Sequence, residues 1–580
     1  MTKPLLVWSA LWPAVVAAQA FAPGQGSQPG ALDGGADIQS ASLYCKNCHN
    51  NENASPDPDN PEPLPYAPVD TWASTMMANS VRDPLFRAAL SVANQDVADV
   101  GQWCLRCHAP QAYWRGHTLP ADGGAFDAVD NEGVTCDVCH RSHVPSQDAN
   151  APYIGNAQIF VDATGLKFGP YDDSSSPFHP TAKSSFTSSS ALCGQCHQVF
   201  NPILPWRASD GGVLAPHFPL DTTYEEWKQS AFARGTFADG ARSCQNCHMP
   251  AFEGSDGGIA AGPTADGGWG YPVAKMGPYR AQPQRHTFAG GNVWGLDAVL
   301  QANPDLQPLA AQFAETKRWA MKNLNEAATL ALTVPADGYL GEASKVTVKV
   351  TNHTGHKLPT GYADGRRVFV QLEVDGVVLS GAFTDAGTVL PGGQPLRVYE
   401  AVHGRAGSGP GEHLALHDTI VKDSRIPPQG FQATLLTAPV GVDWFNAGDG
   451  GYLPYDEASF VVPLNGKAPG STVNVTARLF MQTTTPEYVH FLAEENRTDD
   501  AGQVLKGVFD ALGGAPPLLM AERSASFRLS DSPQGTGGGQ SGQEGHGPAA
   551  CGCHAAAGGL WLFGLALLAL GRAKWKLPRP

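Results

Sequence analysis

The chain has 580 residues, with 38 lysine and arginine against 54 aspartate and glutamate residues, so its net charge is −16. This acidic balance argues against nucleic-acid binding, which needs clustered basic side chains to displace counterions, and makes basic surfaces the expected docking partners. The apolar fraction of 42% excludes a wholly disordered chain. The length predicts about two to four domains.

Residues 1–20 have the pattern of a secretory signal peptide. Lys3 supplies a positive start, Leu5 to Ala17 form a mostly apolar run, and Ala18-Gln19-Ala20 is a small-x-small cleavage site. The run is short for a membrane span, although an N-terminal anchor is the alternative. We therefore expect an exported protein.

Ten of the twelve cysteines belong to five copies of one pattern, Cys-x-x-Cys-His. The copies are Cys45, Cys48 and His49; Cys104, Cys107 and His108; Cys136, Cys139 and His140; Cys193, Cys196 and His197; and Cys244, Cys247 and His248. This pattern is the attachment signature of c-type haem. On one helical turn the two thiols share a face and can bond the vinyl groups of one porphyrin, and the histidine that follows can bind the iron.

Other uses of paired cysteines fit this pattern less well. A disulfide framework leaves the histidine after each pair unexplained, and zinc sites take their ligands in fours. Residues 21–530 contain no cysteine outside the motifs, so no thiol remains for a structural disulfide. The sequence therefore predicts five covalent haem c groups, each with its iron and a proximal histidine from its own motif.

The sixth iron ligands have to come from outside the motifs. The candidate histidines are His117, His143, His179, His217, His286 and His356. The sequence contexts of His179, His286 and His356 favour these three most. His356 stands in a tight turn rich in glycine and proline, which can present its side chain rigidly.

His143 and two methionines leave alternatives open. His143 follows His140 too closely to bind the same iron, but it could serve another haem. Met76 and Met77 are possible thioether ligands, which would raise the potential of their haem, or they are core residues.

Residues 21–300 form the predicted pentahaem domain. The motifs leave about 40 residues per haem, which is too little chain for a conventional core around each one, so the porphyrins themselves must serve as core. We expect short helices at 83–94 and 224–233. No segment of this domain alternates as a strand would.

The pattern changes in the second half of the chain. Residues 301–334 form a connecting segment in which 306–330 has helical spacing, and residues 335–530 have the alternation of strands separated by turns. Strand runs lie at 346–350, 368–374 and 473–479, and helical additions at 488–494 and 502–512. The predicted fold class is α+β and multidomain, with a mostly α-helical and irregular multihaem domain followed by an antiparallel, immunoglobulin-like β-sandwich.

Five stretches of the chain resemble the exported multihaem cytochromes c of the cytochrome c-552/4-like superfamily. They are Asn-Ser-Val-Arg-Asp-Pro-Leu-Phe at 79–86, Gly-Val-Thr-Cys-Asp-Val-Cys-His at 133–140, Thr-Tyr-Glu-Glu-Trp at 223–227, Cys-Gln-Asn-Cys-His-Met-Pro at 244–250 and Gly-His-Lys-Leu-Pro-Thr-Gly at 355–361. The resemblance implies electron transfer, mostly bis-histidine haems and a C-terminal β-domain that touches the haem cluster. It also implies His356 as a ligand, whereas relatives often lack histidines that match His117 and His143.

The C-terminal end has the composition of a linker and an anchor. Residues 531–550 are rich in Gly, Gln and Ser, which predicts a flexible linker. Residues 551–580 contain Cys-Gly-Cys, an apolar run and a basic end, and they resemble the myxobacterial-type C-terminal sorting tag. The alternative is a plain transmembrane anchor. We expect a periplasmic or cell-surface protein that is attached to the membrane through this tail.

Three functions fit these features. We expect an electron carrier that connects redox partner proteins, because every predicted haem has its own proximal histidine. An alternative is a multihaem reductase or oxidase of a small nitrogen or sulfur compound with one open haem. The absence of a Cys-x-x-Cys-Lys motif counts against the ammonia-forming nitrite reductases. A third alternative is a binding or adhesion module, in which Tyr362, Arg366 and Arg367 would face a ligand.

Overall fold

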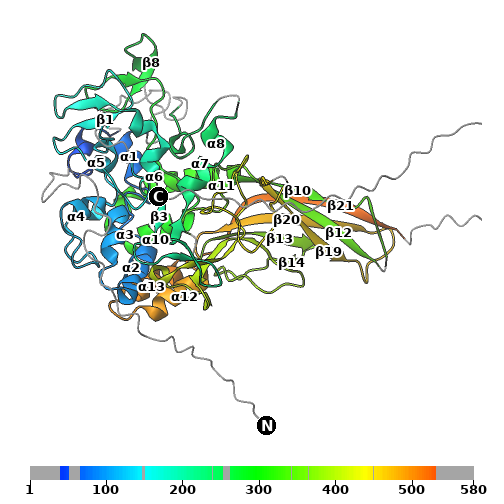
Figure 1. Cartoon of the computed structure of the whole chain (residues 1–580). Helices are drawn as coiled ribbons and strands as arrows, with labels where there is room; N and C mark the ends of the chain where they lie inside the picture. The colour runs from blue at the N-terminus through cyan, green and yellow to red at the C-terminus, as the bar shows by residue number, and fades with distance from the viewer. Residues whose placement is uncertain are drawn as a thin grey trace, which may run out of the picture. The chain divides into compact units, whose positions relative to one another are not determined.

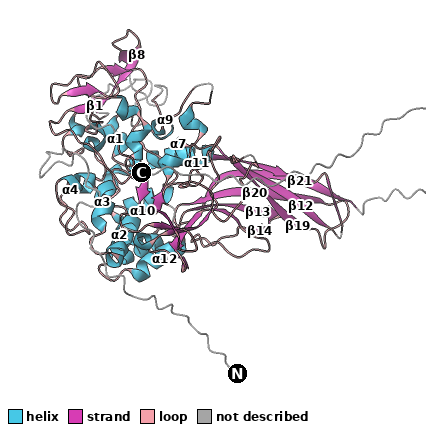
Figure 2. Cartoon of the chain, in the orientation of Figure 1, coloured by secondary structure: helices cyan, strands magenta, loops and turns pink. Residues whose placement is uncertain are grey.

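The computed structural model describes residues 40–50, 66–146, 151–237, 240–252, 261–340, 342–362, 365–448 and 450–530. The predicted signal peptide, linker and C-terminal anchor or sorting tag lie outside the described residues. Within the described ranges, no helix combines the length and the apolar content that a membrane span needs. Figures 1 and 2 show a region of short helices and loops beside a region of long strands.

The helical region, residues 40–302, is built from short elements. They are η1 (Cys45–Asn47), α1 (Pro68–Trp72), α2 (Pro84–Asp96), α3 (Gly101–His108), α4 (Pro110–Trp114), η3 (Asp130–Glu132), α5 (Cys136–His140), η4 (Ser185–Ser188), α6 (Ser190–Gly194), α7 (Thr223–Lys228), α8 (Ala231–Arg234), α9 (Cys244–His248) and α10 (Val293–Ala302). α2 confirms the expected helix at 83–94, and the carboxylate of Asp83 caps it by accepting from the backbone N–H of Leu85.

The helix expected at 224–233 is wrong as a single element. α7 ends at Lys228 and α8 begins at Ala231. Ser230 between them has an extended backbone, and its side chain accepts from the N–H of Phe232 as the cap of α8. The capping serine therefore starts a new helix inside the segment that we expected to form a single one.

The strands of the helical region contain two to four residues each. They are β1 (Lys167–Gly169), β2 (Thr181–Lys183), β3 (Val199–Phe200), β4 (Trp206–Arg207), β5 (Val213–Ala215), β6 (Pro219–Asp221), β7 (Gly262–Pro263), β8 (Trp269–Pro272) and β9 (Tyr279–Arg280). Their shortness agrees with the lack of strand-like alternation in the sequence.

The connecting helix is shorter than the expected 306–330. Its first turn is the 3-10 helix η5 (Pro304–Leu309), which contains Pro308, and α11 (Ala310–Ala327) follows. The chain then enters β10 (Ala328–Thr333), because these residues pair with the next long strand. Strand pairing therefore overrides the helical spacing after Ala327.

The strand region, residues 328–530, contains the long elements. After β10 come β11 (Asp337–Tyr339), β12 (Ala343–Asn352), β13 (Arg367–Val374), β14 (Val377–Ser380), β15 (Arg397–Tyr399), β16 (Ala401–Arg405), β17 (Gly409–Pro410), η6 (Leu414–Leu416), β18 (Thr419–Asp423), β19 (Tyr455–Pro463), β20 (Thr472–Gln482), α12 (Pro486–Glu495), α13 (Ala501–Ala511) and β21 (Leu518–Ser530). The predicted strands at 346–350, 368–374 and 473–479 and both helical additions are confirmed.

Two sheets enclose one apolar core in the strand region. One sheet has the order β10-β12-β19, and the other has the order β11-β21-β20-β13-β14 with β15 also paired to β13. Alternate residues such as Val348 and Val370 are fully buried between the sheets, as the sequence pattern predicts. The pairing of β11 with β21 is parallel, which departs from the expected antiparallel arrangement. The immunoglobulin-like strand order stays a prediction.

The two regions also share a second core. Ala88 and Val92 of α2 and Trp294 of α10 are buried against Leu492 of α12 and Phe509 of α13. Figure 1 shows α2, α12 and α13 side by side. The helical additions of the strand region therefore complete the helical region.

Candidate functional site

The five motifs lie on short helical turns. α5 and α9 span the third and fifth motifs, α3 ends on the second, α6 contains Cys193 of the fourth, and η1 contains Cys45 of the first. Ser189 caps α6, and Ser243 with Asn246 forms a capping box at α9. Local capping therefore produces the single turn that brings two thiols and an imidazole to one face.

Cysteines of different motifs lie close to one another. The thiols of Cys45 and Cys136 lie close enough to shift each other's pKa, as do those of Cys107 and Cys196 and those of Cys193 and Cys244. The fourth motif thus lies near the second and the fifth, and the first lies near the third. Cys139 of the third motif lies near enough to Cys193 and Cys196 to affect them electrostatically. The five motifs form one connected group.

Backbone carbonyls orient four of the motif histidines through Nδ1. The pairs are His49 with Val273 at 3.0 Å, His108 with Ser80 at 3.3 Å, His140 with Phe168 at 2.8 Å and His248 with Ala289 at 2.7 Å. Such a contact fixes the ring and leaves Nε2 for a metal. Burial lowers the pKa of His108 and of His248 to about 4, which favours the neutral form that binds iron.

Two of the expected distal histidines face a motif histidine. The ring centroids of His140 and His286 are 6.2 Å apart, and those of His248 and His356 are 6.4 Å apart. The Nδ1 atoms of His286 and His356 face backbone carbonyls at 3.2 and 2.9 Å. Two metal–nitrogen bonds of about 2 Å place facing imidazole centroids roughly 6 Å apart. Both pairs therefore fit an iron between their Nε2 atoms.

His179 lies near the first and third motifs. Burial lowers the pKa of His49 and of His140, and the nearby His179 lowers both further. His217 is exposed, and its Nδ1 faces the backbone oxygen of Asn201 at 3.0 Å. Neither ring is placed opposite a motif histidine, so His179 and His217 stay predicted ligands.

His143 and the two methionines lie in apolar surroundings. The ring of His143 stacks on Phe168 with centroids 5.8 Å apart. Met76 packs against the cluster that contains Leu296 and Phe313, as the core alternative predicts. Met77 is half-buried, and its carbonyl accepts from the backbone N–H of Val134 at 2.9 Å.

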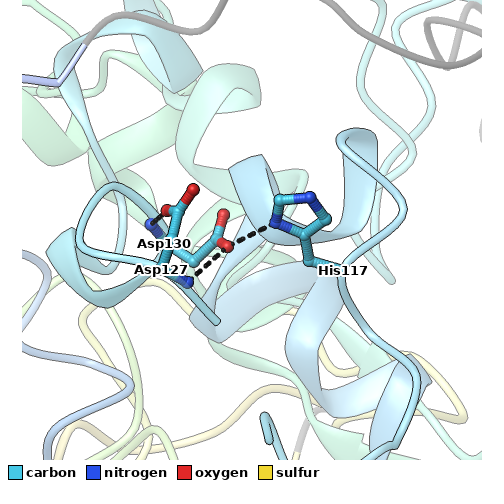
Figure 3. Close-up of side chains that lie close together, drawn as sticks. All are labelled: His117, Asp127 and Asp130. Atoms are coloured by element: carbon cyan, nitrogen blue, oxygen red, sulfur yellow. Dashed lines mark hydrogen bonds and ion pairs between the residues drawn. The ribbon is translucent and has the colours of Figure 1, made fainter. Parts of the chain in front are cut away.

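His117 belongs to a small acidic group, which Figure 3 shows with Asp127 and Asp130. Nδ1 of His117 lies 2.7 Å from Oδ2 of the buried Asp130. Arg115 binds both carboxylates, at 2.7 Å from Asp130 and 2.5 Å from Asp127. Because Arg115 neutralises these acids, the group is a poor cation site. Nε2 of His117 stays available, so its predicted role as a haem ligand remains untested.

Arg106, inside the second motif, offers a partner for an anionic group. Its side chain is 2% exposed, and its Nε and Nη2 have no hydrogen-bond partner among the described residues. The guanidinium carbon lies 5.4 Å from the ring centroid of Tyr113. A buried cation in such surroundings needs a counter-charge, and a haem propionate would supply one. Sequence reasoning missed this residue, although it stands between the two cysteines.

The three residues of the adhesion alternative make internal contacts. The hydroxyl of Tyr362 hydrogen-bonds to that of Tyr488, Arg366 donates to the carbonyl of Thr360 at 2.8 Å, and Arg367 donates to Gln482 at 2.9 Å. Because all three side chains bond to residues of the same chain, they act as packing residues in this structure.

Two comparisons with known proteins find similarities. Residues 44–141 match the family model for cytochrome c554 and c-prime. A penta-haem cytochrome c552 from Thermochromatium tepidum is similar in structure, with a TM-score of 0.44 and 17% identity, over 84% of this chain and 99% of that one. No curated protein matches. The family match supports a multihaem cytochrome c that uses haem c and its iron in electron transfer.

Proposed function

We propose that this chain is a pentahaem electron carrier of the cell envelope, with one covalent haem c at each motif. The facing histidine pairs carry this proposal, since His140 with His286 and His248 with His356 would each hold an iron from both sides. An iron with two protein ligands has no open position for a substrate, so its chemistry is the gain and loss of one electron.

The proximity of the motifs supports transfer from haem to haem. Cysteines of the fourth motif lie near those of the second and the fifth, and cysteines of the first lie near those of the third. Attachment points this close bring neighbouring porphyrins together. We assign His179 to the iron of His49, and His117, His143 and His217 are the candidates for the two remaining irons.

An enzyme with an open haem is the second candidate. In the part of the chain that the structure describes, the motif histidines His49, His108 and His197 have no ring contact with another histidine, and His179 lies near the first of them. Phe86 stacks on His108 with centroids 3.7 Å apart. An open iron at the second or fourth motif would suit a reductase or oxidase of a small nitrogen or sulfur compound.

The tail and the net charge suggest where this carrier acts and what it meets there. An exported chain that is held at the membrane or the cell surface by residues 551–580 would meet redox partners there. The net charge of −16, to which ten propionates would add, favours partners with basic surfaces. Electron exchange with such a partner should slow as ionic strength rises.

Mass spectrometry and spectroscopy of the mature protein test the proposal. We expect five haem adducts on the denatured chain and low-spin ferric spectra. His286→Ala and His356→Ala should each convert one fifth of the haem to high spin, because each removes one axial ligand. A mass without haem adducts would contradict the proposal. A high-spin fraction of the unaltered protein that binds cyanide would favour the enzyme.

A further inference from the structure

A buried group of four charged side chains lies beside the turn that carries His356. This ion cluster consists of Glu226 of α7, Lys357, Asp423 of β18 and Arg425, and none of the four is more than 7% exposed. Lys357 Nζ lies 2.6 Å from Asp423, and Arg425 contacts Asp423 at 2.7 Å and Glu226 at 2.9 Å. Two acids and two bases make the cluster neutral.

Glu226 joins the cluster to the His356 turn, which we define as residues 352–361. Its Oε2 accepts from the backbone N–H of Lys357 at 3.1 Å and from the hydroxyl of Thr360 at 2.6 Å. Glu226 thus binds the residue directly after His356. The helical region and the strand region meet at this carboxylate.

The turn is also fitted closely against the helical region. A Cβ added to Gly355 would lie 3.3 Å from Trp227 of α7 and 3.3 Å from Phe232 of α8. The side-chain amide of Asn352 donates to the carbonyl of His356 at 2.8 Å. The backbone that carries His356 is therefore held from both sides, and α7 and α8 precede the motif of His248 in the chain.

Stability alone gives a weak reason for such a cluster. Burying charges costs several kcal/mol per ion, and apolar residues of similar volume often stabilise a protein as well or better. In some proteins buried polar and ionic groups do, however, fix the relative position of the elements that they join, because each charge has to keep its partner. Here the cluster joins the turn that carries His356 to α7, which belongs to the same helical region as His248 of α9.

We propose that Glu226, Lys357, Asp423 and Arg425 are positioning residues that hold His356 opposite His248, so that the strand region controls the coordination of the fifth haem. This inference rests on the proposed function. It assigns the cluster a role in ligand geometry that is separate from the stability of the fold.

The test compares spin states in the haem-loaded full chain. His356→Ala should make one fifth of the haem high-spin, and Glu226→Gln, which keeps the shape but removes the charge, should give a smaller high-spin fraction. Added imidazole should restore the low-spin spectrum of both variants by replacing the ligand. The double variant should show no more high-spin haem than His356→Ala.

Glu373→Gln is the matched control. It makes the same substitution in the strand region and breaks a Glu–Arg pair with Arg478 at 2.7 Å, but Glu373 lies in β13 opposite Thr476, away from the His356 turn. Its spectrum should stay low-spin. Rescue by imidazole separates lost positioning of His356 from a general loss of stability, because imidazole replaces a ligand and does not restore a fold.

The outcomes separate the two proposals. If His356→Ala leaves all haem low-spin, the ligand assignment in the proposed function is wrong. If His356→Ala gives high-spin haem while Glu226→Gln matches the control, the positioning role is wrong. Should Glu226→Gln fail to fold, Thr360→Val removes one hydrogen bond to Glu226, and an unchanged low-spin spectrum of that variant would overturn the positioning role.

Discussion

The helical region and the strand region bury their apolar side chains in different ways. Among the described residues, one cluster of 31 buried residues fills the space between the sheets and under α11. Apart from the core of eleven buried residues that the helical region shares with α12 and α13, the clusters centred on this region contain two to five buried residues each, such as the one around Trp103 and Trp206. A protein normally needs a larger core for a region of this length. The helical region therefore depends on its bound groups, whereas the strand region depends on its side chains.

Removing haem should have the largest effect, because it tests directly whether the two regions are stabilised in different ways. We expect the full chain, produced without haem attachment, to lose the fold of residues 40–302 while the sheets persist. Limited proteolysis with mass mapping of the cleavage sites measures this difference. Equal resistance of both regions would show that the small clusters are sufficient.

A cavity in the large core should have the next largest effect. Leu479 of β20 is fully buried, and Leu479→Ala should lower the free energy of unfolding of the strand region by about 2–5 kcal/mol. Urea unfolding, monitored by tryptophan fluorescence, measures this change in the free energy of unfolding. Val504→Ala, on an exposed position of α13, is the control and should change the stability by about 0.5 kcal/mol or less.

A polar contact between the regions gives the smallest predicted effect. Nδ1 of His413 lies 2.9 Å from Asp96 at the end of α2, and this hydrogen bond raises the pKa of His413. A raised pKa in the folded state adds stability below the unfolded pKa, and this stability is lost as pH rises through the folded pKa. Asp96→Asn should therefore cost about 1 kcal/mol or less near pH 5.5 and almost nothing near pH 9.

Thermal unfolding of the haem-loaded protein at both pH values measures this dependence. His413→Ala should remove the same pH-dependent stability. A loss that is equal at the two pH values would assign the effect of Asp96 to packing instead of charge.

The sequence could predict the elements whose signals are local. Asp83 and Pro84 start α2, alternating valines mark β12 and β13, and the spacing of cysteine and histidine marks the motifs. The end of α11 was missed because Ala328 pairs with Asn352, and propensity carries no information about such a partner.

The site was predictable to a similar degree. The sequence named His286 and His356 as ligand candidates, and the structure places each opposite a motif histidine. It could not show which motif each would face. The contact of Glu226 with Arg425 joins residues far apart in the chain, and neither residue has a neighbouring pattern that would reveal the other.

The packing of α12 and α13 on α2 and α10 has a consequence for dissecting this protein into fragments. A piece cut after residue 302 would leave the apolar faces of Ala88, Val92 and Trp294 uncovered in water, where they would favour aggregation. A minimal fragment of the helical region therefore needs residues 486–515 supplied as a graft or as a second chain. The border between folding units does not coincide with the border between consecutive stretches of sequence.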